Sequence, residues 1–192
     1  MRNEMAIATG RPRDTLIDDA VLSATRELLV RDGYLRLTIA GVAEAAGTTK
    51  PAIYRRWPTK AHLVHEAVFP AQPADEVASF GDLRSDIRAL VGAALDLLGR
   101  PAARAALPGL LAETAADNAL AVEVLGRAAG GTYAWLDARL AMDDVRPGVS
   151  AATVFELAAG AAFIATTTRV AKDIDKTWID TTVDVIVRGI AA

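Results

Sequence analysis

The sequence has 192 residues, enough to bury one sizeable hydrophobic core. Hydrophobic residues make up 52% of it but aromatic residues only 5%. This excess of alanine, leucine and valine favours packed helices over sheets and predicts an all-α fold. The absence of cysteine excludes disulfides, thiolate zinc sites and cysteine nucleophiles. We expect no export signal and a cytoplasmic location.

The net charge of −3 is unevenly distributed along the chain. Residues 1–69 hold ten Lys and Arg against eight Asp and Glu, a net charge of +2. Residues 70–192 hold eleven against sixteen, a net charge of −5. A small basic surplus is weak evidence for nucleic-acid binding when it stands alone. The asymmetry nevertheless predicts that the two parts of the chain face different partners.

The first segment, residues 1–13, shows no helical periodicity and contains Gly10 and Pro12, which predicts a flexible basic arm. An amphipathic helix is predicted from Thr15 to Gly33, because glycine suits the left-handed position after a helix end. Its apolar positions recur every three or four residues at Ile17, Val21, Ala24 and Leu28.

Three short helices are predicted next, each beginning at a threonine that can cap the first free amides. They cover residues 38–47, 49–57 and 59–69. Pro51 lies in the first turn of the second of these helices, where its missing N–H costs little. Pro70 and Pro73 then mark a break in the chain, and we expect the domain boundary there.

The remaining chain is predicted to form a bundle of longer helices. Their expected ranges are residues 82–98, 101–106, 108–116, 119–142, 150–170 and 175–189. A kink or break is expected at Gly130 and Gly131, because each glycine inside a helix costs about 1 kcal/mol relative to alanine. The predicted organisation is an arm (1–13), a domain of short helices (14–69) and a C-terminal helical domain (70–192).

Two short helices joined at Gly47 form a helix-turn-helix, in which residues 49–57 are the second helix. Lys50 and Lys60 lie in the first turns of their helices, where the macrodipole is positive and acidic residues are preferred. An exposed surface tolerates one such lysine. Two in one motif favour a phosphate backbone at these helix ends, because exposed amides and a cation together bind anions.

The run TIAGVAEAAGTTKPAIYRRWPTKAHLV, residues 38–64, resembles the DNA-binding signature of the tetracycline-repressor (TetR) family. The matching positions are Thr49, Lys50, Tyr54, Trp57, Pro58 and Lys60. The resemblance covers residues 14–69. One departure is Gly41, where the family usually has an acidic or polar residue, so the reciprocal cap on that helix is missing.

The resemblance implies two kinds of DNA contact. The residues expected to face bases in the major groove are Thr49, Lys50, Pro51, Ala52 and Arg55, and those expected to contact phosphates are Thr38, Tyr54 and Lys60. Lys50 or Arg55 has the donors that guanine requires, and the methyl groups of Thr49 and Ala52 suit a thymine methyl. The bases that these side chains read stay open.

Other residues of this region have less specific roles. Ile53 and Trp57 are expected to pack inward, as large apolar groups on a short helix usually do. Arg11 and Arg13 in the arm suit insertion into a narrow minor groove. A merely solvated tail explains these two arginines equally well.

The resemblance also implies a C-terminal helical bundle that forms the dimer and a small-molecule pocket. The homodimer is expected to pair through the last two helices. Within residues 150–168 the only charge is Glu156, so this helix must be buried on more than one side. A membrane span is the alternative, but alanine, glycine and threonine are weakly hydrophobic and no basic flank orients the helix, so no membrane role is expected.

The sequence indicates the ligand pocket only through apolar residues, which are more often simple core. The candidate lining residues are Leu95, Leu98, Leu111, Glu113, Trp135, Phe155 and Phe163. Asn118 and Tyr133 are further candidates for polar contacts. No effector is specified.

His62 and His65 are spaced i, i+3 beside Glu66, but they lack a third strong ligand, so no metal site is predicted. We identify no catalytic motif and expect neither an enzyme nor a cofactor. The predicted function is a ligand-responsive regulator, a repressor in the usual family pattern, that binds a near-palindromic operator as a homodimer. Two alternatives stay open: a small-molecule-binding helical dimer without a DNA role, and a ligand-independent DNA-binding regulator.

Overall fold

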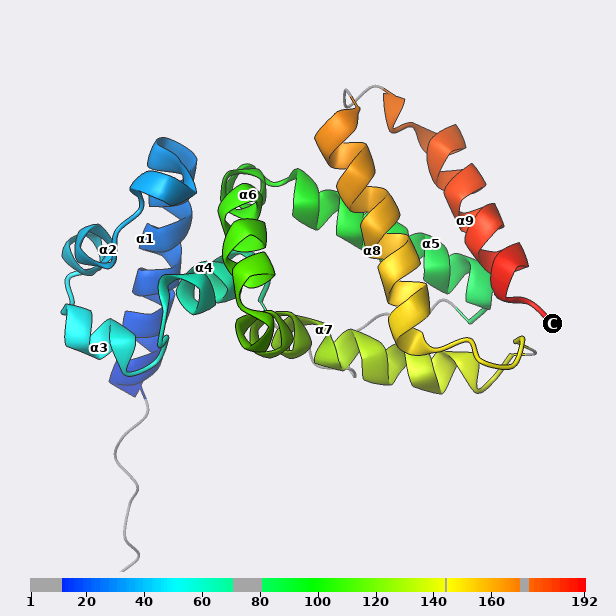
Figure 1. Ribbon diagram of the computed structural model, residues 1–192, viewed down its shortest axis with the longest axis horizontal. Coiled ribbons are helices and arrows are strands. Elements are labelled where there is room, and N and C mark those ends of the chain that lie inside the picture. Colours follow the sequence, from blue (N-terminus) through cyan, green and yellow to red (C-terminus); the bar gives the residue numbers. More distant parts are fainter. Residues whose placement is uncertain (1–11, 71–80, 144, 170–172) are drawn as a thin grey trace, which may run out of the picture.

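The computed structural model describes residues 12–70, 81–143, 145–169 and 173–192, and within these ranges the fold is all-α. Arg11 lies outside the described residues, and so does the side chain of Arg13, although its backbone is helical. Figure 1 shows short N-terminal helices at one end of the molecule and longer C-terminal helices at the other. The predicted fold class is confirmed.

Helix α1 (Pro12–Arg36) begins three residues before the predicted start, inside the segment expected to be a flexible arm. Gly33 interrupts this helix with φ 76° and ψ 169°, a conformation that side chains with a Cβ rarely adopt. The regular helix therefore breaks at the predicted glycine, and residues 34–36 form a further turn.

Helices α2 (Ile39–Ala45), α3 (Lys50–Tyr54) and α4 (Lys60–Val68) follow α1. Each begins after a threonine whose Oγ1 accepts a backbone hydrogen bond, from Gly41 N at 3.1 Å, Ala52 N at 3.4 Å and His62 N at 3.3 Å. All three predicted threonine caps are confirmed. The regular part of α3 is shorter than the predicted 49–57, because its end tightens into a turn in which Arg56 N and Trp57 N both donate to Ile53 O.

The short helices share one core with part of the C-terminal domain. Ile53 and Trp57 are buried in it as predicted, and Trp57 Nε1 donates to Glu66 Oε2 at 2.9 Å. Ala103, Ala106 and Leu110 belong to the same core although they follow the break by some thirty residues. The two ends of the molecule are thus joined by packed side chains as well as by the chain itself.

The C-terminal helices are α5 (Leu83–Gly99), α6 (Pro101–Ala116), α7 (Asn118–Leu140), α8 (Ala151–Thr168) and α9 (Lys176–Ile190). Side chains of Asp82, Asp117, Ser150 and Asp175 cap four of them. These caps explain why the predicted starts agree with the structure to within one residue.

Two predicted breaks are wrong, since α6 and α7 each continue as one helix. A kink at Gly130 and Gly131, the other expectation for α7, stays a prediction. Helix α6 continues through Pro108, although proline removes one backbone hydrogen bond. Ala106 and Gly109 on either side of it are buried, and their packing keeps the helix continuous. Helix α7 continues across Gly130 and Gly131 and ends at Leu140, two residues before the predicted end. The propensity cost of two glycines is small beside the packing of a helix of 23 residues.

A second core joins α5, α7, α8 and α9 through residues such as Ile87, Leu136, Val154 and Val183. Asp86 is fully buried there and pairs with Arg139 Nε at 3.0 Å, so the buried carboxylate keeps a cationic partner. Helix α8 is long and apolar enough to cross a membrane, but one face of it packs into this core. Only 28% of α8 is buried within the chain.

Candidate DNA-binding surface

Helices α2 and α3 form the helix-turn-helix around Gly47. This glycine has φ 62°, in the left-handed region, and its N–H donates to Glu44 O at 3.2 Å. Ile53 anchors α3 to the core with a side chain that is 1% exposed. The orientation of α3 is therefore fixed by one buried residue, and its opposite face is directed to solvent.

The five residues predicted to read bases lie together on that solvent face. Thr49, Lys50, Pro51 and Arg55 are exposed, and Ala52 is half-buried. Lys50 has no carboxylate partner among the residues that the structure describes, which leaves its charge available to an incoming polyanion. The surface combines donors and small methyl groups, which is the chemistry of base readout in a major groove.

Two of the three predicted phosphate contacts border this face. Tyr54 is 49% exposed, and Thr38 is exposed at the start of α2 with its hydroxyl accepting from Gly41 N. Thr38 lies beside the first amides of α2, and Tyr54 lies at the end of α3, so both can offer a hydroxyl to a flanking phosphate. Arg56 instead turns inward, because its Nε pairs with Asp18 Oδ1 at 2.7 Å and so fastens the end of α3 to α1.

Lys60, the third predicted phosphate contact, is half-buried against α1 and α6. Its Nζ donates to Tyr34 O at 3.3 Å, lies 4.1 Å from the centre of the Tyr34 ring, and is 3.9 Å from Glu113 Oε1 on α6. The side chain is only 26% exposed. In this conformation Lys60 links the DNA-binding end to the C-terminal domain rather than joining the exposed face of α3.

The same junction contains an unusually close approach between α6 and the turn after Gly33. A Cβ placed on Gly109 would lie 2.0 Å from Tyr34 Cδ1, so no larger residue fits there without movement. Burial and the neighbouring Glu113 raise the pKa of Tyr34 above its ordinary value, and the phenol stays neutral. Tyr34, Gly109, Lys60 and Glu113 therefore form one packed cluster, the α6 junction.

A second contact between the ends joins α4 to α7. His62 is buried, its Nδ1 lies 2.8 Å from Thr59 Oγ1, and its Nε2 lies 3.3 Å from Glu123 Oε2. His65 is also buried, and burial together with His62 lowers its pKa to about 4. Among the described residues no group of three metal-ligating side chains surrounds these histidines.

Two family models match consecutive parts of the chain. Residues 21–67 match the bacterial regulatory proteins of the tetR family, and residues 77–186 match the tetracyclin repressor-like C-terminal domain. The chain belongs to the TetR family of transcriptional regulators.

Curated relatives of this TetR-family chain match it over less than half of its length. A DNA-binding transcriptional repressor TetR from Mycobacteroides abscessus is 39% identical over 88 residues, 45% of this chain and 44% of that protein. An uncharacterized HTH-type transcriptional regulator from Mycobacterium bovis is 40% identical over 77 residues, 40% of this chain and 36% of that protein. The matches thus span less than half the length of these relatives.

Solved structures of TetR-family proteins share the fold over nearly the whole chain. A TetR transcriptional regulator from Rhodococcus sp. RHA1 has a TM-score of 0.64 and 20% identity, covering 92% of this chain and 98% of that chain. NalD from Pseudomonas aeruginosa, the secondary repressor of the MexAB-OprM multidrug efflux pump, has a TM-score of 0.58 and 19% identity, covering 93% and 98%. At these identities the likeness concerns the fold alone.

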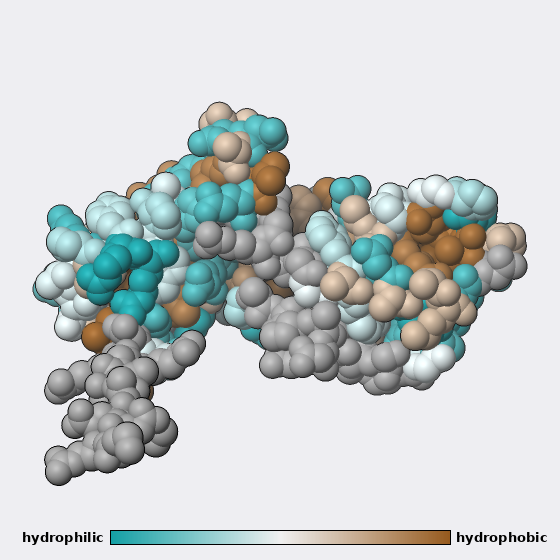
Figure 2. All heavy atoms as spheres, turned by 90° about the horizontal axis from the view of Figure 1, so that it is seen from below, coloured by the Kyte–Doolittle hydropathy of each residue, from teal (hydrophilic) through white to brown (hydrophobic). Residues whose placement is uncertain are grey.

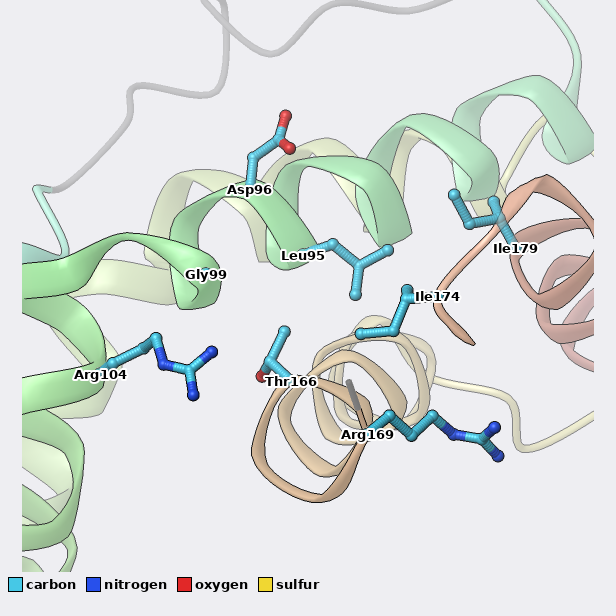
Figure 3. Close-up of a pocket in the computed structure, with 8 residues that line it drawn as sticks. All are labelled: Leu95, Asp96, Gly99, Arg104, Thr166, Arg169, Ile174 and Ile179. Carbon is cyan, nitrogen blue, oxygen red and sulfur yellow. The ribbon is translucent and has the colours of Figure 1, made fainter. Parts of the chain in front are cut away.

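The C-terminal domain of this TetR-family chain contains a pocket of about 370 Å³ between α5, the start of α6, the end of α8 and the start of α9 (Figure 3). Leu95 is the one predicted ligand contact that lines it. The other predicted ligand contacts lie elsewhere. Phe155 packs edge-on against Tyr133, with ring centres 5.2 Å apart, in the second core, and Trp135 borders that core. Leu111 is exposed, Leu98 and Phe163 are half-buried, and Glu113 belongs to the α6 junction.

Sequence reasoning missed the pocket residues Arg104, Thr166 and Ile174, and it missed Tyr34 and Gly109 in the α6 junction. A glycine beside a proline inside an otherwise regular helix was the one local signal of a close approach at Gly109. No comparable local signal marks Tyr34, because its role depends on a helix that follows about 70 residues later.

Proposed function

We propose that the chain is a ligand-responsive transcriptional repressor that binds a near-palindromic operator as a homodimer and is released by a small-molecule inducer. The observation that carries this proposal is the exposed face of α3, which gathers Lys50 and Arg55 around an anchoring Ile53. The proposal places the protein in the cytoplasm and assigns it no catalytic residue, cofactor or metal.

The DNA contacts follow from this surface. Thr49, Lys50, Pro51, Ala52 and Arg55 face the major groove, and Thr38 and Tyr54 contact the flanking phosphates. Lys60 reaches a phosphate once its ammonium leaves Glu113, a movement of its flexible stem and of α4. Arg11 and Arg13, on either side of the first residue of α1, enter the minor groove of the operator. Residues 14–69 act as the DNA-binding domain.

The dimer forms through residues 70–192, with α8 and α9 of one copy against those of the other. Leu157 and Ile164 on α8 and Val185 on α9 are exposed in the single chain. Figure 2 shows apolar surface at the end of the molecule that carries the C-terminal helices, whereas polar surface predominates around the N-terminal helices. An isologous four-helix contact buries this apolar face and sets two α3 helices about 34 Å apart.

Regulation follows from the two contacts between the ends of the chain. A ligand in the C-terminal domain that favours a different position of α6 also moves Tyr34 and α4, since both pack against α6. The two α3 helices then lose the spacing of successive major grooves, and operator affinity falls.

The decisive experiment measures binding of the protein to the DNA immediately upstream of its own gene, at two salt concentrations, against an unrelated duplex of equal length. We expect selective, salt-sensitive binding. Arg55→Ala is expected to weaken it about 5- to 150-fold through a lost base contact, and Lys60→Ala to reduce the salt slope by about one.

The matched control is Arg146→Ala, which removes an exposed arginine of the C-terminal domain. Equal weakening by Arg55→Ala and Arg146→Ala means that only overall charge matters and contradicts base readout. If the protein does not bind the operator but a small molecule raises its unfolding temperature, the result supports the alternative of a ligand-binding helical dimer without a DNA role. Operator binding without any such ligand supports a ligand-independent regulator.

A further inference from the structure

The pocket of the C-terminal domain has an apolar side and a cationic side. Leu95 on α5 and the two isoleucines at positions 174 and 179 supply the apolar side. In Figure 3 the side chains of Leu95 and Ile174 point toward one another, and the guanidinium of Arg104 projects from α6 toward the same opening. An occupant must therefore present apolar surface to one wall and polar groups to the other.

The charge directed into the pocket is positive. Asp96 and Arg169 also border the pocket, but Figure 3 shows the Asp96 carboxylate and the Arg169 guanidinium pointing away from its centre. Thr166 Oγ1 donates to Ala162 O at 2.9 Å, so the hydroxyl proton already has an acceptor within α8. Arg104 is thus the strong hydrogen-bond donor that faces the opening.

Arg104 is exposed and lacks the carboxylate partner that three other arginines of the same domain have. Residues 70–192 carry a net charge of −5, and Arg84, Arg88 and Arg139 each pair with an aspartate. The guanidinium of Arg104 makes no hydrogen bond or ion pair with any residue that the structure describes. An arginine left unpaired among excess carboxylates, at the mouth of a pocket, has all five donors available for an anion.

The first turn of α6 adds to the same electrostatic field. This helix begins at Pro101 beside Gly99, a residue of the pocket wall. Its N-cap residue, Arg100, makes no side-chain capping bond, and the first turn contains no acidic residue. The partial positive charge of this helix end is therefore not neutralised by a neighbouring side chain and reinforces the attraction of Arg104 for an anion.

We propose that this pocket binds an organic carboxylate with an apolar body, and that this class of molecule is the effector; the inference rests on the proposed function of the chain. The carboxylate pairs with Arg104, and the apolar body lies between Leu95 and Ile174. A volume of about 370 Å³ is near the lower end of the usual range for small-molecule sites, which favours an alkyl or aryl acid of modest size.

Helix α6 carries this binding event to the DNA-binding end. Glu113 follows Arg104 by nine residues, about 13 Å along the helix axis, and lies 3.9 Å from Lys60. Between them Gly109 is in close contact with Tyr34. An anion that draws the start of α6 toward the pocket moves these contacts together, because the helix transmits the displacement as a rigid element.

The test uses the full chain and measures its unfolding temperature with four probes: octanoate, 3-phenylpropanoate, 1-octanol and octylamine. We expect both carboxylates to raise the unfolding temperature in a concentration-dependent way, and the alcohol and the amine to have a much smaller effect. Arg104→Gln is expected to weaken carboxylate binding at least about tenfold. Arg146→Gln, which removes an exposed arginine outside the pocket, is the matched control and keeps the effect.

Equal stabilisation by carboxylates and alcohol, no stabilisation by either carboxylate, or a carboxylate effect that survives Arg104→Gln would overturn the proposal. Operator binding is measured in parallel with the same probes. A chain that binds carboxylates through Arg104 but ignores the upstream DNA contradicts the proposed function and supports the pocket. A chain that binds the upstream DNA but is not stabilised by carboxylates supports the proposed function and contradicts the proposed pocket ligand.

Discussion

Replacing Gly109 by alanine tests the α6 junction directly. The new Cβ would lie 2.0 Å from Tyr34 Cδ1, 2.3 Å from Cγ and 2.6 Å from Cε1. The ring has no free direction in which to move, because Tyr34 is only 4% exposed and the Lys60 ammonium lies 4.1 Å from its centre. The substitution therefore forces α6 away from α1.

The expected cost combines two opposing effects. Alanine inside a helix gains about 1 kcal/mol over glycine. Overpacking of this severity costs about 3 kcal/mol, the upper end of the usual range, because the clash involves a buried ring rather than the end of a flexible chain. The net loss is about 2 kcal/mol, or about 4–8 °C in unfolding temperature for a chain of this size.

The assay is thermal or urea unfolding of Gly109→Ala, with Gly92→Ala on α5 as the control, since a Cβ at Gly92 meets nothing within 4 Å. Gly92→Ala is expected to leave stability unchanged or to raise it. The double variant Tyr34→Ala with Gly109→Ala should lose less than the sum of the two single losses, because removing the ring removes the clash. A Gly109→Ala protein as stable as Gly92→Ala refutes the reasoning.

Three further predictions concern the ion pair, the buried histidine and the exposed apolar face. Glu113→Gln removes the partner of Lys60 and should raise operator affinity by up to about fivefold, which corresponds to the free energy of a partly exposed ion pair. The control, Glu156→Gln on α8, makes the same change of charge and should leave operator affinity unchanged. The pKa of His65 is lowered from 6.5 to about 4. The unfolded chain therefore binds the extra proton first as the pH falls. This contribution to stability is fully present above pH 6.5 and is lost toward pH 4, by about 3 kcal/mol at about 1.4 kcal/mol per pH unit. His65→Gln should flatten this part of a urea-unfolding series against pH, and an unchanged slope would contradict the assignment. Ile164→Glu should give a monomer in sedimentation experiments, whereas Val122→Glu, at an exposed position on α7, should not; two unchanged dimers would exclude α8 from the interface.

The sequence predicted those features of the fold that depend on neighbouring residues. Thr38, Thr49 and Thr59 cap their helices through hydrogen bonds that span three residues, so the pattern of residue types is sufficient to place them. The break at Gly33 likewise depends on one residue's conformation. The exposed face of α3 followed from the position of one buried residue, Ile53.

Features that depend on distant packing were not predictable in this way. Pro108 is a strong local signal for a break, yet buried neighbours contributed by α1 and α4 keep α6 continuous. The location of Lys60 depends on Glu113, 53 residues later, and the location of the pocket depends on where four helices meet. An apolar residue such as Leu98 has the same sequence signature whether it lines a pocket or fills a core.

The small buried fraction of α8, 28% in a single chain, has a consequence for the amount of protein in the cell. In the proposed dimer the second copy covers this helix, so folding and association are linked and stability depends on concentration. Newly synthesised chains that have not met a partner expose apolar surface to proteases and degrade faster than assembled ones. The rate of synthesis then sets both the number of dimers and the lifetime of each chain, and a modest fall in expression removes a disproportionate share of functional regulator.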